Sequence, residues 1–268
     1  MLEARFSNWK NNPRKWRPGF VAKGIFSVLR QCYETCLEYP EEKRRLQLVA
    51  QTRQRLMTPP LEPEYVNILL DNEFADSVAQ VKDLTCLDFA RLANVWTLAR
   101  TAGPGIYLEV GSFRGGTALH ICNAIADRKA EFFCFDPFEK GGYEKLGELD
   151  KWFKPNDFTQ TGFERVKGLL SSKPYAKVIQ GYFPDAAEGL DLKNIAFCHL
   201  DVNTYDATQR SLEFLAPRLS SRGLIVIDDY GMTETPGVVK AVVEFLAIHP
   251  SFMLIPMFPV QAVLLPKS

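Results

Sequence analysis

Short apolar runs alternate with amphipathic stretches along the later part of the chain. The runs are typical of buried strands and lie at 106–110, 131–135, 176–180, 196–200 and 224–227. The stretches with helical spacing begin at Thr117 and at 161–172, 206–219 and 236–248. This alternation predicts a parallel sheet with helices on both faces and right-handed crossovers. Two final runs, 252–256 and 261–265, predict a closing pair that includes an antiparallel strand.

The front part of the chain has a different, mostly helical pattern. Helical spacing occurs at 21–57, at 64–70 and at 85–102, where Thr85 is a candidate N-cap. Gly103-Pro104-Gly105 then ends the last of these helices just before the first strand. The sequence therefore predicts a helical N-terminal extension, with a role as a lid, over 1–102 and an α/β domain over 103–268.

The first strand leads directly into a glycine-rich turn with the sequence GIYLEVGSFRGGT. Gly111, Gly115 and Gly116 leave backbone N–H groups open to a polar ligand where the next helix begins. The spacing G-x-x-x-G-G differs from the G-x-G-x-x-G of dinucleotide enzymes. Glu109 lies so close to the turn that a positively charged ligand, such as S-adenosylmethionine, fits better than a pyrophosphate. A plain glycine turn is the alternative.

Carboxylates follow the ends of three predicted strands. Asp136 comes 20 residues after Gly116, where an acidic side chain can accept hydrogen bonds from ribose hydroxyls. Asp201, Asp228 and Asp229 would repel one another at the same edge of the sheet unless a cation neutralised them. Such a set of hard oxygen ligands suits Mg²⁺ or Ca²⁺. The alternative is that these aspartates cap turns and helices and bind no ligand.

Composition and net charge limit the kinds of binding partner that the protein is expected to have. The 32 basic and 32 acidic residues cancel, so no overall field attracts nucleic acid or an anionic membrane. No run approaches the roughly 18 apolar residues of a membrane span, and no signal peptide is visible. Six scattered cysteines indicate a reduced, cytoplasmic protein. The basic and aromatic residues of 1–20 favour an arm packed on its own or a neighbouring subunit, which leaves a homo-oligomer open.

Several motifs together resemble the macrocin O-methyltransferase family, whose members methylate sugar hydroxyls of macrolides and aminocoumarins. They cover about residues 85–250 and read LEVGSFRGGT, FCFDPFE, GYFPD, HLDVNTYDAT and IVIDDYG followed by Pro236-Gly237. The resemblance implies a Rossmann-like class I methyltransferase fold with a mostly parallel seven-stranded sheet and a C-terminal antiparallel hairpin. One departure is that members often read D-G-D where this chain has Asp201-Val202-Asn203.

The resemblance also implies the residues of the site. S-adenosylmethionine is expected near the glycine turn and the second strand, with residues 181–183 beside the adenine: Glu109, Gly111, Ser112, Arg114, Gly115, Asp136, Gly181, Tyr182 and Phe183. Mg²⁺ is expected at Asp201, Asp228 and Asp229, and Asp201 is the preferred proton acceptor. Candidate acceptor contacts are Glu139, Asn203 and Tyr230. The 137–160 segment, with Tyr143, Trp152 and Phe153, is expected to help form a lid and pocket.

These observations favour a Mg²⁺-dependent O-methyltransferase that acts on a hydroxylated small molecule. Two other classes stay open. A nicotinamide-dependent dehydrogenase is disfavoured by the glycine spacing and by three carboxylates where a hydride acceptor would lie. A non-catalytic adenosyl-binding or interaction protein is kept open by the Asn203 departure. The acceptor itself, whether a sugar, a phenol or another hydroxyl, is not encoded in the fold or the cofactor site.

Overall fold

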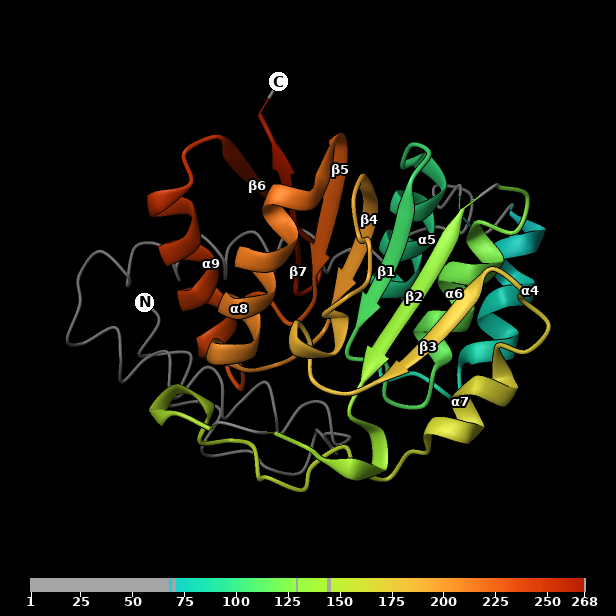
Figure 1. Ribbon diagram of the computed structural model, residues 1–268, viewed down its shortest axis with the longest axis horizontal. Helices are drawn as coiled ribbons and strands as arrows, with labels where there is room; N and C mark the ends of the chain where they lie inside the picture. The colour runs from blue at the N-terminus through green and yellow to red at the C-terminus, as the bar shows by residue number, and fades with distance from the viewer. Residues whose placement is uncertain (1–67, 69–70, 129, 144–145, 268) are drawn as a thin grey trace, which may run out of the picture. The chain divides into compact units, whose positions relative to one another are not determined.

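The computed structural model describes residues 68, 71–128, 130–143 and 146–267 (Figure 1). All of them belong to one compact unit, Val66–Ser268. The basic-aromatic arm, the helices predicted at 21–57 and nearly all of the 64–70 segment lie outside the described residues. The unit begins ahead of the predicted 102/103 boundary, and the lid role of 1–102 stays a prediction.

Seven strands of the described chain form one sheet in the order β3-β2-β1-β4-β5-β7-β6 (Figure 1). Their bounds are Ile106–Val110 for β1, Glu131–Asp136 for β2, Ala176–Gln180 for β3, Ile195–Leu200 for β4, Leu219–Ile227 for β5, Phe252–Met257 for β6 and Gln261–Pro266 for β7. Strands β1 to β5 are parallel. Strand β7 runs antiparallel to both β5 and β6. The predicted parallel sheet with a C-terminal antiparallel hairpin is therefore confirmed.

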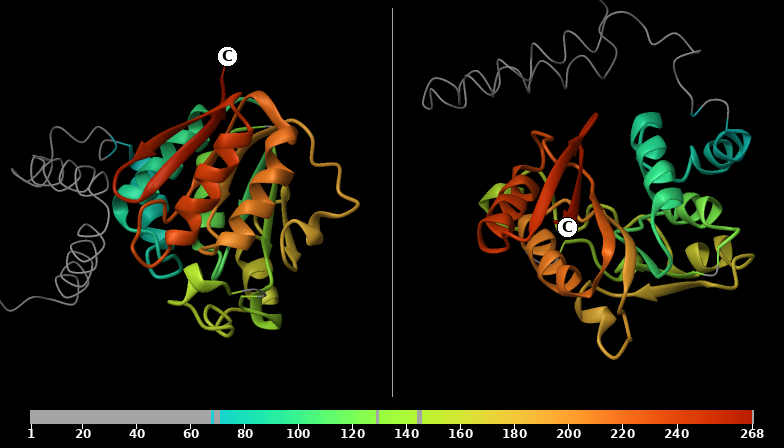
Figure 2. Two further views of the ribbon diagram at one scale, coloured as in Figure 1. Left: turned by 90° about the vertical axis from the view of Figure 1, so that its left-hand side faces the viewer. Right: turned by 90° about the horizontal axis from the view of Figure 1, so that it is seen from above.

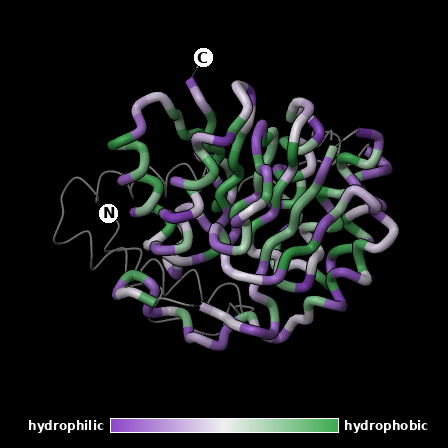
Figure 3. The backbone as a smooth tube through the Cα atoms, viewed as in Figure 1, coloured by the Kyte–Doolittle hydropathy of each residue, from purple (hydrophilic) through white to green (hydrophobic). Residues whose placement is uncertain are grey.

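Helices cover both faces of this sheet (Figure 2). One face carries α4 (Asn72–Val81), α5 (Phe89–Thr101), α6 (Gly116–Ala124) and α7 (Phe163–Leu169), and the other carries α8 (Tyr205–Leu215) and α9 (Pro236–Ile248). Neighbouring strand residues alternate between the two cores: Tyr107 packs toward α4–α6, and Leu108 packs toward α8 and α9. The strands are accordingly the most hydrophobic part of the backbone trace (Figure 3). Among the described helices, none combines the length and apolarity that crossing a bilayer requires.

The start of α5 differs from the sequence prediction. Asp88, not Thr85, is the N-cap, and its Oδ1 accepts a hydrogen bond from the Arg91 backbone N–H at 3.0 Å. Thr85 instead shares a hydrogen bond with Thr117 at the start of α6. Helix α4 was not predicted, although Asp71 caps it in the same way and could have indicated it.

The segment between β2 and α7 contains two short 3₁₀ turns, η3 (Phe138–Lys140) and η4 (Glu148–Asp150). It runs along the edge of the sheet to which β1 and β2 point (Figure 1). Asp150 is buried and accepts hydrogen bonds from the backbone N–H groups of Gly147 and Tyr205, each at 3.0 Å. These bonds tie the segment to the start of α8, so it lies close to the carboxyl ends of the strands.

Candidate active site

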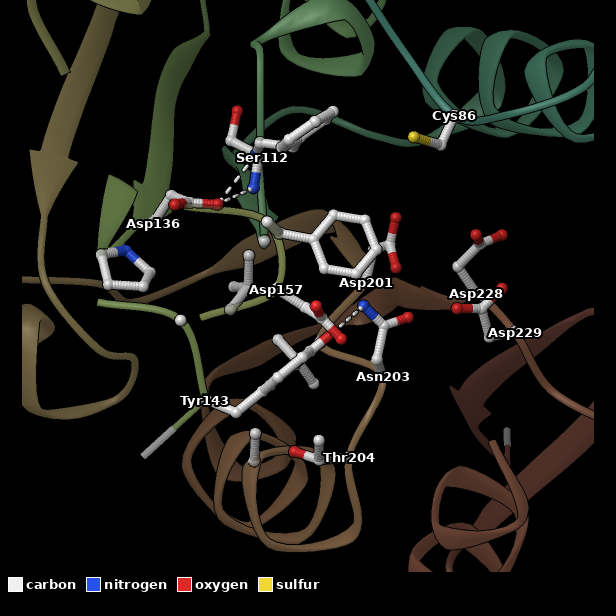
Figure 4. A pocket seen from close by; sticks show the side chains of 18 of the residues that line it. Cys86, Ser112, Asp136, Tyr143, Asp157, Asp201, Asn203, Thr204, Asp228 and Asp229 are labelled. Atoms are coloured by element: carbon white, nitrogen blue, oxygen red, sulfur yellow. Dashed lines mark hydrogen bonds between the residues drawn. The ribbon is translucent and has the colours of Figure 1, made fainter. Parts of the chain in front are cut away.

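The site lies where the strand order reverses, between β1 and β4. Parallel strands leave a crevice at their carboxyl ends at such a point, and ligands of open α/β sheets bind there. A cavity of about 490 Å³ occupies this position. Its walls come from the turns after β1, β2, β3, β4 and β5, from residues 141–143, 153, 157 and 158 and from the residues ahead of α5 (Figure 4). The volume is that of a small-molecule site.

Gly111 allows the chain to leave β1 against the end of β4. Its backbone has φ +86°, and a Cβ at this position would lie 1.8 Å from the backbone oxygen of Asp201. Gly115, with φ +79°, is the N-cap of α6, and a Cβ there would lie 2.8 Å from Val166 Cγ1. Both positions need glycine because the backbone is left-handed and the neighbouring atoms are too close for a side chain.

Asp136 holds the glycine turn in place. Its Oδ2 accepts hydrogen bonds from the N–H groups of Ser112 and Phe113 at 2.8 Å, and its Oδ1 accepts one from Phe138 at 2.6 Å (Figure 4). Burial raises the pKa of Asp136 to about 6, although the three N–H donors act in the opposite direction. A carboxylate offers about four lone-pair directions, so about one is left for a ribose hydroxyl. The predicted ribose contact stays a prediction.

Replacing Asp136 by alanine is therefore expected to affect stability as well as cofactor binding. Buried N–H groups would lose their acceptor, so we expect a loss of about 3 kcal/mol in the free energy of unfolding. Chemical denaturation would measure it, and calorimetric titration with S-adenosylhomocysteine would show the weaker binding. Glu131→Ala is the matched control because it removes an exposed carboxylate at the other end of β2. Equal stability of the two variants would contradict the role assigned to Asp136.

Three aspartates meet on the opposite wall of the cavity, where β4 and β5 end (Figure 4). One side-chain oxygen from each of Asp201, Asp228 and Asp229 lies within 4.8 Å of the others. Burial and then the neighbouring carboxylates raise the pKa of Asp201 well above its usual range and that of Asp229 to about 7. Such a cluster requires positive charge nearby, and its donor set of hard oxygens fits a divalent cation.

The structure adds a cation that the sequence did not predict. Arg91 Nη1, on α5, lies 2.6 Å from Asp228 Oδ2 and 3.4 Å from Asp229 Oδ1. The same guanidinium donates to Asp88 Oδ2 at 3.2 Å and to the backbone oxygen of Cys86 at 2.7 Å. No local pattern could have indicated this pairing, because Arg91 and Asp228 are 137 residues apart.

Tyr143 closes one side of the cavity. Asn203 Nδ2 donates a hydrogen bond to Tyr143 Oη at 2.9 Å (Figure 4). The Tyr143 ring packs on Phe153, with the ring centroids 4.9 Å apart, and on Phe158. Trp152, predicted to belong to the same wall, is 45% exposed and lies outside the lining. The bond from Asn203, the residue that departs from the D-G-D pattern, thus joins the end of β4 to the 141–158 segment.

The cavity gathers most of the predicted site residues. Those that line it are Gly111, Ser112, Asp136, Gly181, Tyr182, Phe183, Asp201, Asn203, Asp228 and Asp229. Those that do not are Glu109, Arg114, Gly115, Glu139 and Tyr230. Glu109 is buried beneath the glycine turn, where it accepts a hydrogen bond from Ser112 Oγ at 2.8 Å and lies 3.5 Å from His199 Nδ1.

The other residues outside the lining have structural contacts. The Arg114 guanidinium lies over the Phe113 ring, 4.8 Å from its centroid. Glu139 accepts hydrogen bonds from the Phe163 N–H, at the start of α7, and from the Gln180 side chain. The Phe163 bond lowers the pKa of Glu139. Tyr230 packs against the core under α8 and α9. The geometry therefore places neither Glu139 nor Tyr230 against an acceptor in the cavity.

The charge of the cavity suits a cationic ligand. Two basic side chains line it, Arg91 and Arg210, against seven acidic ones: Asp136, Asp157, Asp201, Asp206, Asp228, Asp229 and Glu234. A sulfonium and an ammonium group would be attracted to such a surface, whereas a pyrophosphate would be repelled. The residues present thus fit S-adenosylmethionine better than a dinucleotide.

The strand order, the antiparallel β7 between β5 and β6, and the cavity beside the glycine turn define a class I methyltransferase fold. Comparison with known proteins agrees: residues 108–230 match a family model described as a methyltransferase domain. Among solved structures, the chain is similar to the O-methyltransferase NovP, with a TM-score of 0.60 and 22% identity over 69% of this chain and 83% of that one. The calicheamicin methyltransferase CalS11 gives a TM-score of 0.56 and 19% identity over 84% and 92% of the two chains.

Two curated proteins are also similar in sequence. One is the 8-demethyl-8-(2,3-dimethoxy-alpha-L-rhamnosyl)-tetracenomycin-C 4'-O-methyltransferase of Streptomyces olivaceus, 29% identical over 55% of this chain. The other is the mycinamicin III 3''-O-methyltransferase of Micromonospora griseorubida, 28% identical over 62% of this chain. The chain spans 63% of the length of the first and 71% of the second. The resemblance drawn from the motifs is confirmed by these matches, and residues 108–230 carry the match to a methyltransferase domain.

Proposed function

We propose that this protein transfers a methyl group from S-adenosylmethionine to a hydroxyl of a small natural-product acceptor, with Mg²⁺ as the metal cofactor. The observation that carries the proposal is the meeting of Asp201, Asp228 and Asp229 in the same cavity as the glycine turn. The curated relatives support the acceptor class, since one is named for a rhamnosyl-substituted tetracenomycin and the other for a mycinamicin. A glycosylated natural product with a free sugar hydroxyl is therefore the first acceptor to test.

Different residues of the chain are proposed to bind the cofactor and the metal. The turn at Gly111 and Ser112 and the residues 181–183 form the wall proposed to hold S-adenosylmethionine. Asp201, Asp228 and Asp229 would hold Mg²⁺, which, when bound, lowers the pKa of a hydroxyl and orients it.

Asp201 is the proposed proton acceptor. All three aspartates line the cavity, but Asp228 is held by Arg91 and Gln261, and Asp229 also lies 3.4 Å from Arg91. Burial and the neighbouring carboxylates raise the pKa of Asp201, so it holds a proton more readily than an isolated aspartate does. Methyl transfer requires an in-line attack, so fixing the acceptor between the two walls should supply much of the acceleration. Tyr143 and Phe153 would exclude water from that space.

The proposal predicts methyl transfer that depends on a divalent cation. The test is transfer of a labelled methyl group to a panel of glycosylated macrolides, glycosylated aromatics and simple phenols, with and without EDTA. We expect at least one acceptor to be methylated, EDTA to abolish turnover and added Mg²⁺ to restore it. Binding of S-adenosylhomocysteine in EDTA is the control, because it shows that the protein remains folded.

Other outcomes would favour other functions. Turnover that is insensitive to EDTA would refute the metal role. Failure of every acceptor while S-adenosylhomocysteine binds would favour a non-catalytic binding protein. The dehydrogenase alternative has lost support, because the matched domain and both curated relatives are methyltransferases. The cytoplasmic location, the lack of nucleic-acid and membrane partners and the homo-oligomer stay predictions.

A further inference from the structure

Both oxygens of the Asp228 carboxylate have partners. Oδ1 accepts a hydrogen bond from Gln261 Nε2 at 2.7 Å. Gln261 is itself buried and fixed, since Asn94 Nδ2 donates to its Oε1 at 2.9 Å. Oδ2 accepts from Arg91 Nη1 at 2.6 Å. Gln261 therefore occupies Oδ1 and Arg91 occupies Oδ2. Arg91 is the charged donor of the two, and it also lies 3.4 Å from Asp229 Oδ1.

Arg91 is held so that one arm of its guanidinium reaches the cluster. Nε lies 3.2 Å from Asp88 Oδ2 and Nη2 lies 2.7 Å from the backbone oxygen of Cys86. Because the guanidinium is planar and rigid, Nη1 leaves Asp228 only if these two contacts shift as well. The Arg91 side chain is 13% exposed and that of Asp228 is 1% exposed, so little water screens the charges. The contact is therefore a charge-assisted hydrogen bond between desolvated groups, which is a strong type of contact.

We infer that Arg91 is a built-in competitor of the divalent cation. In the metal-free protein it neutralises Asp228 and Asp229, and it must release Asp228 Oδ2 before a cation can bind there. The inference rests on the proposed function, because it takes the acid cluster to be the metal site. Two consequences follow. The metal-free cluster is kept together despite three adjacent carboxylates, and the affinity for the cation is lower than the same carboxylates alone would give.

The test measures binding of Mn²⁺ by the full chain, using calorimetry and the electron paramagnetic resonance signal of the free ion. Removing a charged hydrogen-bonding competitor should tighten binding, so Arg91→Gln is expected to bind Mn²⁺ roughly ten- to hundredfold more tightly than the natural protein. In EDTA the same variant should have a lower melting temperature, and added Mn²⁺ should raise that temperature by more than in the natural protein. Arg91→Lys, which keeps the charge but has no planar fork, should give a smaller gain in affinity.

Arg210→Gln is the matched control. Arg210 lines the same cavity, but its guanidinium pairs with Asp185 at 2.6 Å, so the substitution removes a positive charge that is paired with a carboxylate outside the acid cluster. A gain in Mn²⁺ affinity as large in Arg210→Gln as in Arg91→Gln would overturn direct competition. Arg91→Lys also keeps the test valid if Arg91→Gln does not fold.

The result separates this inference from the proposed function. If the natural protein binds Mn²⁺, Asp228→Asn does not, and the Arg91 variants bind no more tightly than the natural protein, then the inference is wrong and the metal site stands. If neither the natural protein nor the Arg91 variants bind Mn²⁺, then the metal role in the proposed function is wrong, and the inference is wrong with it.

Discussion

Replacing Asp201 by asparagine is expected to lower kcat on the order of 10²–10⁴-fold, the usual effect of removing a general base. Asp201 lines the cavity beside Asp228 and Asp229, and it is the carboxylate assigned to receive the acceptor's proton. An amide of the same shape can neither take that proton nor supply a negative charge to a cation. Affinity for S-adenosylhomocysteine should change little, because the contacts proposed for it come from the glycine turn, Asp136 and residues 181–183 rather than from the Asp201 side chain.

The Asp201→Asn variant should also be at least as stable as the natural protein. It removes one of three neighbouring carboxylates, so repulsion within the cluster falls. Steady-state kinetics, ligand titration and denaturation would together measure these effects. Asp191→Asn is the control, since the Asp191 carboxylate is exposed and forms an ion pair with the exposed Lys193. A variant that kept full kcat would remove Asp201 from the chemistry.

Replacing Gly111 by alanine is expected to destabilise the protein by about 3 kcal/mol or more, through a left-handed backbone and a collision with a neighbouring strand. The new Cβ would lie 1.8 Å from the backbone oxygen of Asp201. That oxygen belongs to main chain at the end of β4, which is hydrogen-bonded back to β1 through the Asp201 N–H. Relief of the collision would therefore separate the two strands that carry the site, and binding of S-adenosylhomocysteine should weaken as well.

Gly189→Ala isolates the collision from the backbone conformation. Gly189 has φ +80°, close to the +86° of Gly111, but a Cβ there would meet nothing within 4 Å. We expect Gly189→Ala to lower the free energy of unfolding only by the cost of a left-handed backbone in alanine, about 1–2 kcal/mol. Urea denaturation of both variants would compare them. Equal losses of stability at the two positions would contradict the collision. They would show that the chain around Gly111 accommodates a Cβ with no loss beyond that of the left-handed backbone.

The fold was predictable because buried strands and helices each produce a recognisable pattern of apolar residues over a short stretch of sequence. Strands buried on both faces leave continuous apolar runs, and the helices between them leave a stripe at helical spacing. Boundaries were less well predicted: β5 begins at Leu219 rather than at 224, and α5 begins after Asp88 rather than at Thr85. In both cases contacts with neighbouring elements decide where the element begins. Ile195 of β4 pairs with Leu219, and Thr85 bonds to Thr117 of α6.

Part of the site was predictable for a topological reason. The carboxyl ends of parallel strands lie at one edge of the sheet, so acidic residues that follow β2, β4 and β5 had to come near each other. The structure brings Asp201, Asp228 and Asp229 within 4.8 Å. The role of a strand-end acid is less predictable, because a carboxylate binds a backbone N–H as readily as a ligand. Glu139 caps the start of α7 in this way.

The amino-acid order by itself determined the alternating α/β architecture, the glycine turn and the strand-end carboxylates, since each depends on residues close together in the chain. Only the tertiary structure decided what those groups contact. It placed Arg91 and Gln261 on the two oxygens of Asp228 and joined Asn203 to Tyr143 across the cavity. The physical reason is that charge pairing and hydrogen bonding depend on distances in space. Those distances are set by the packing of α5 and of the segment after β2 against the sheet and by the pairing of β7 with β5.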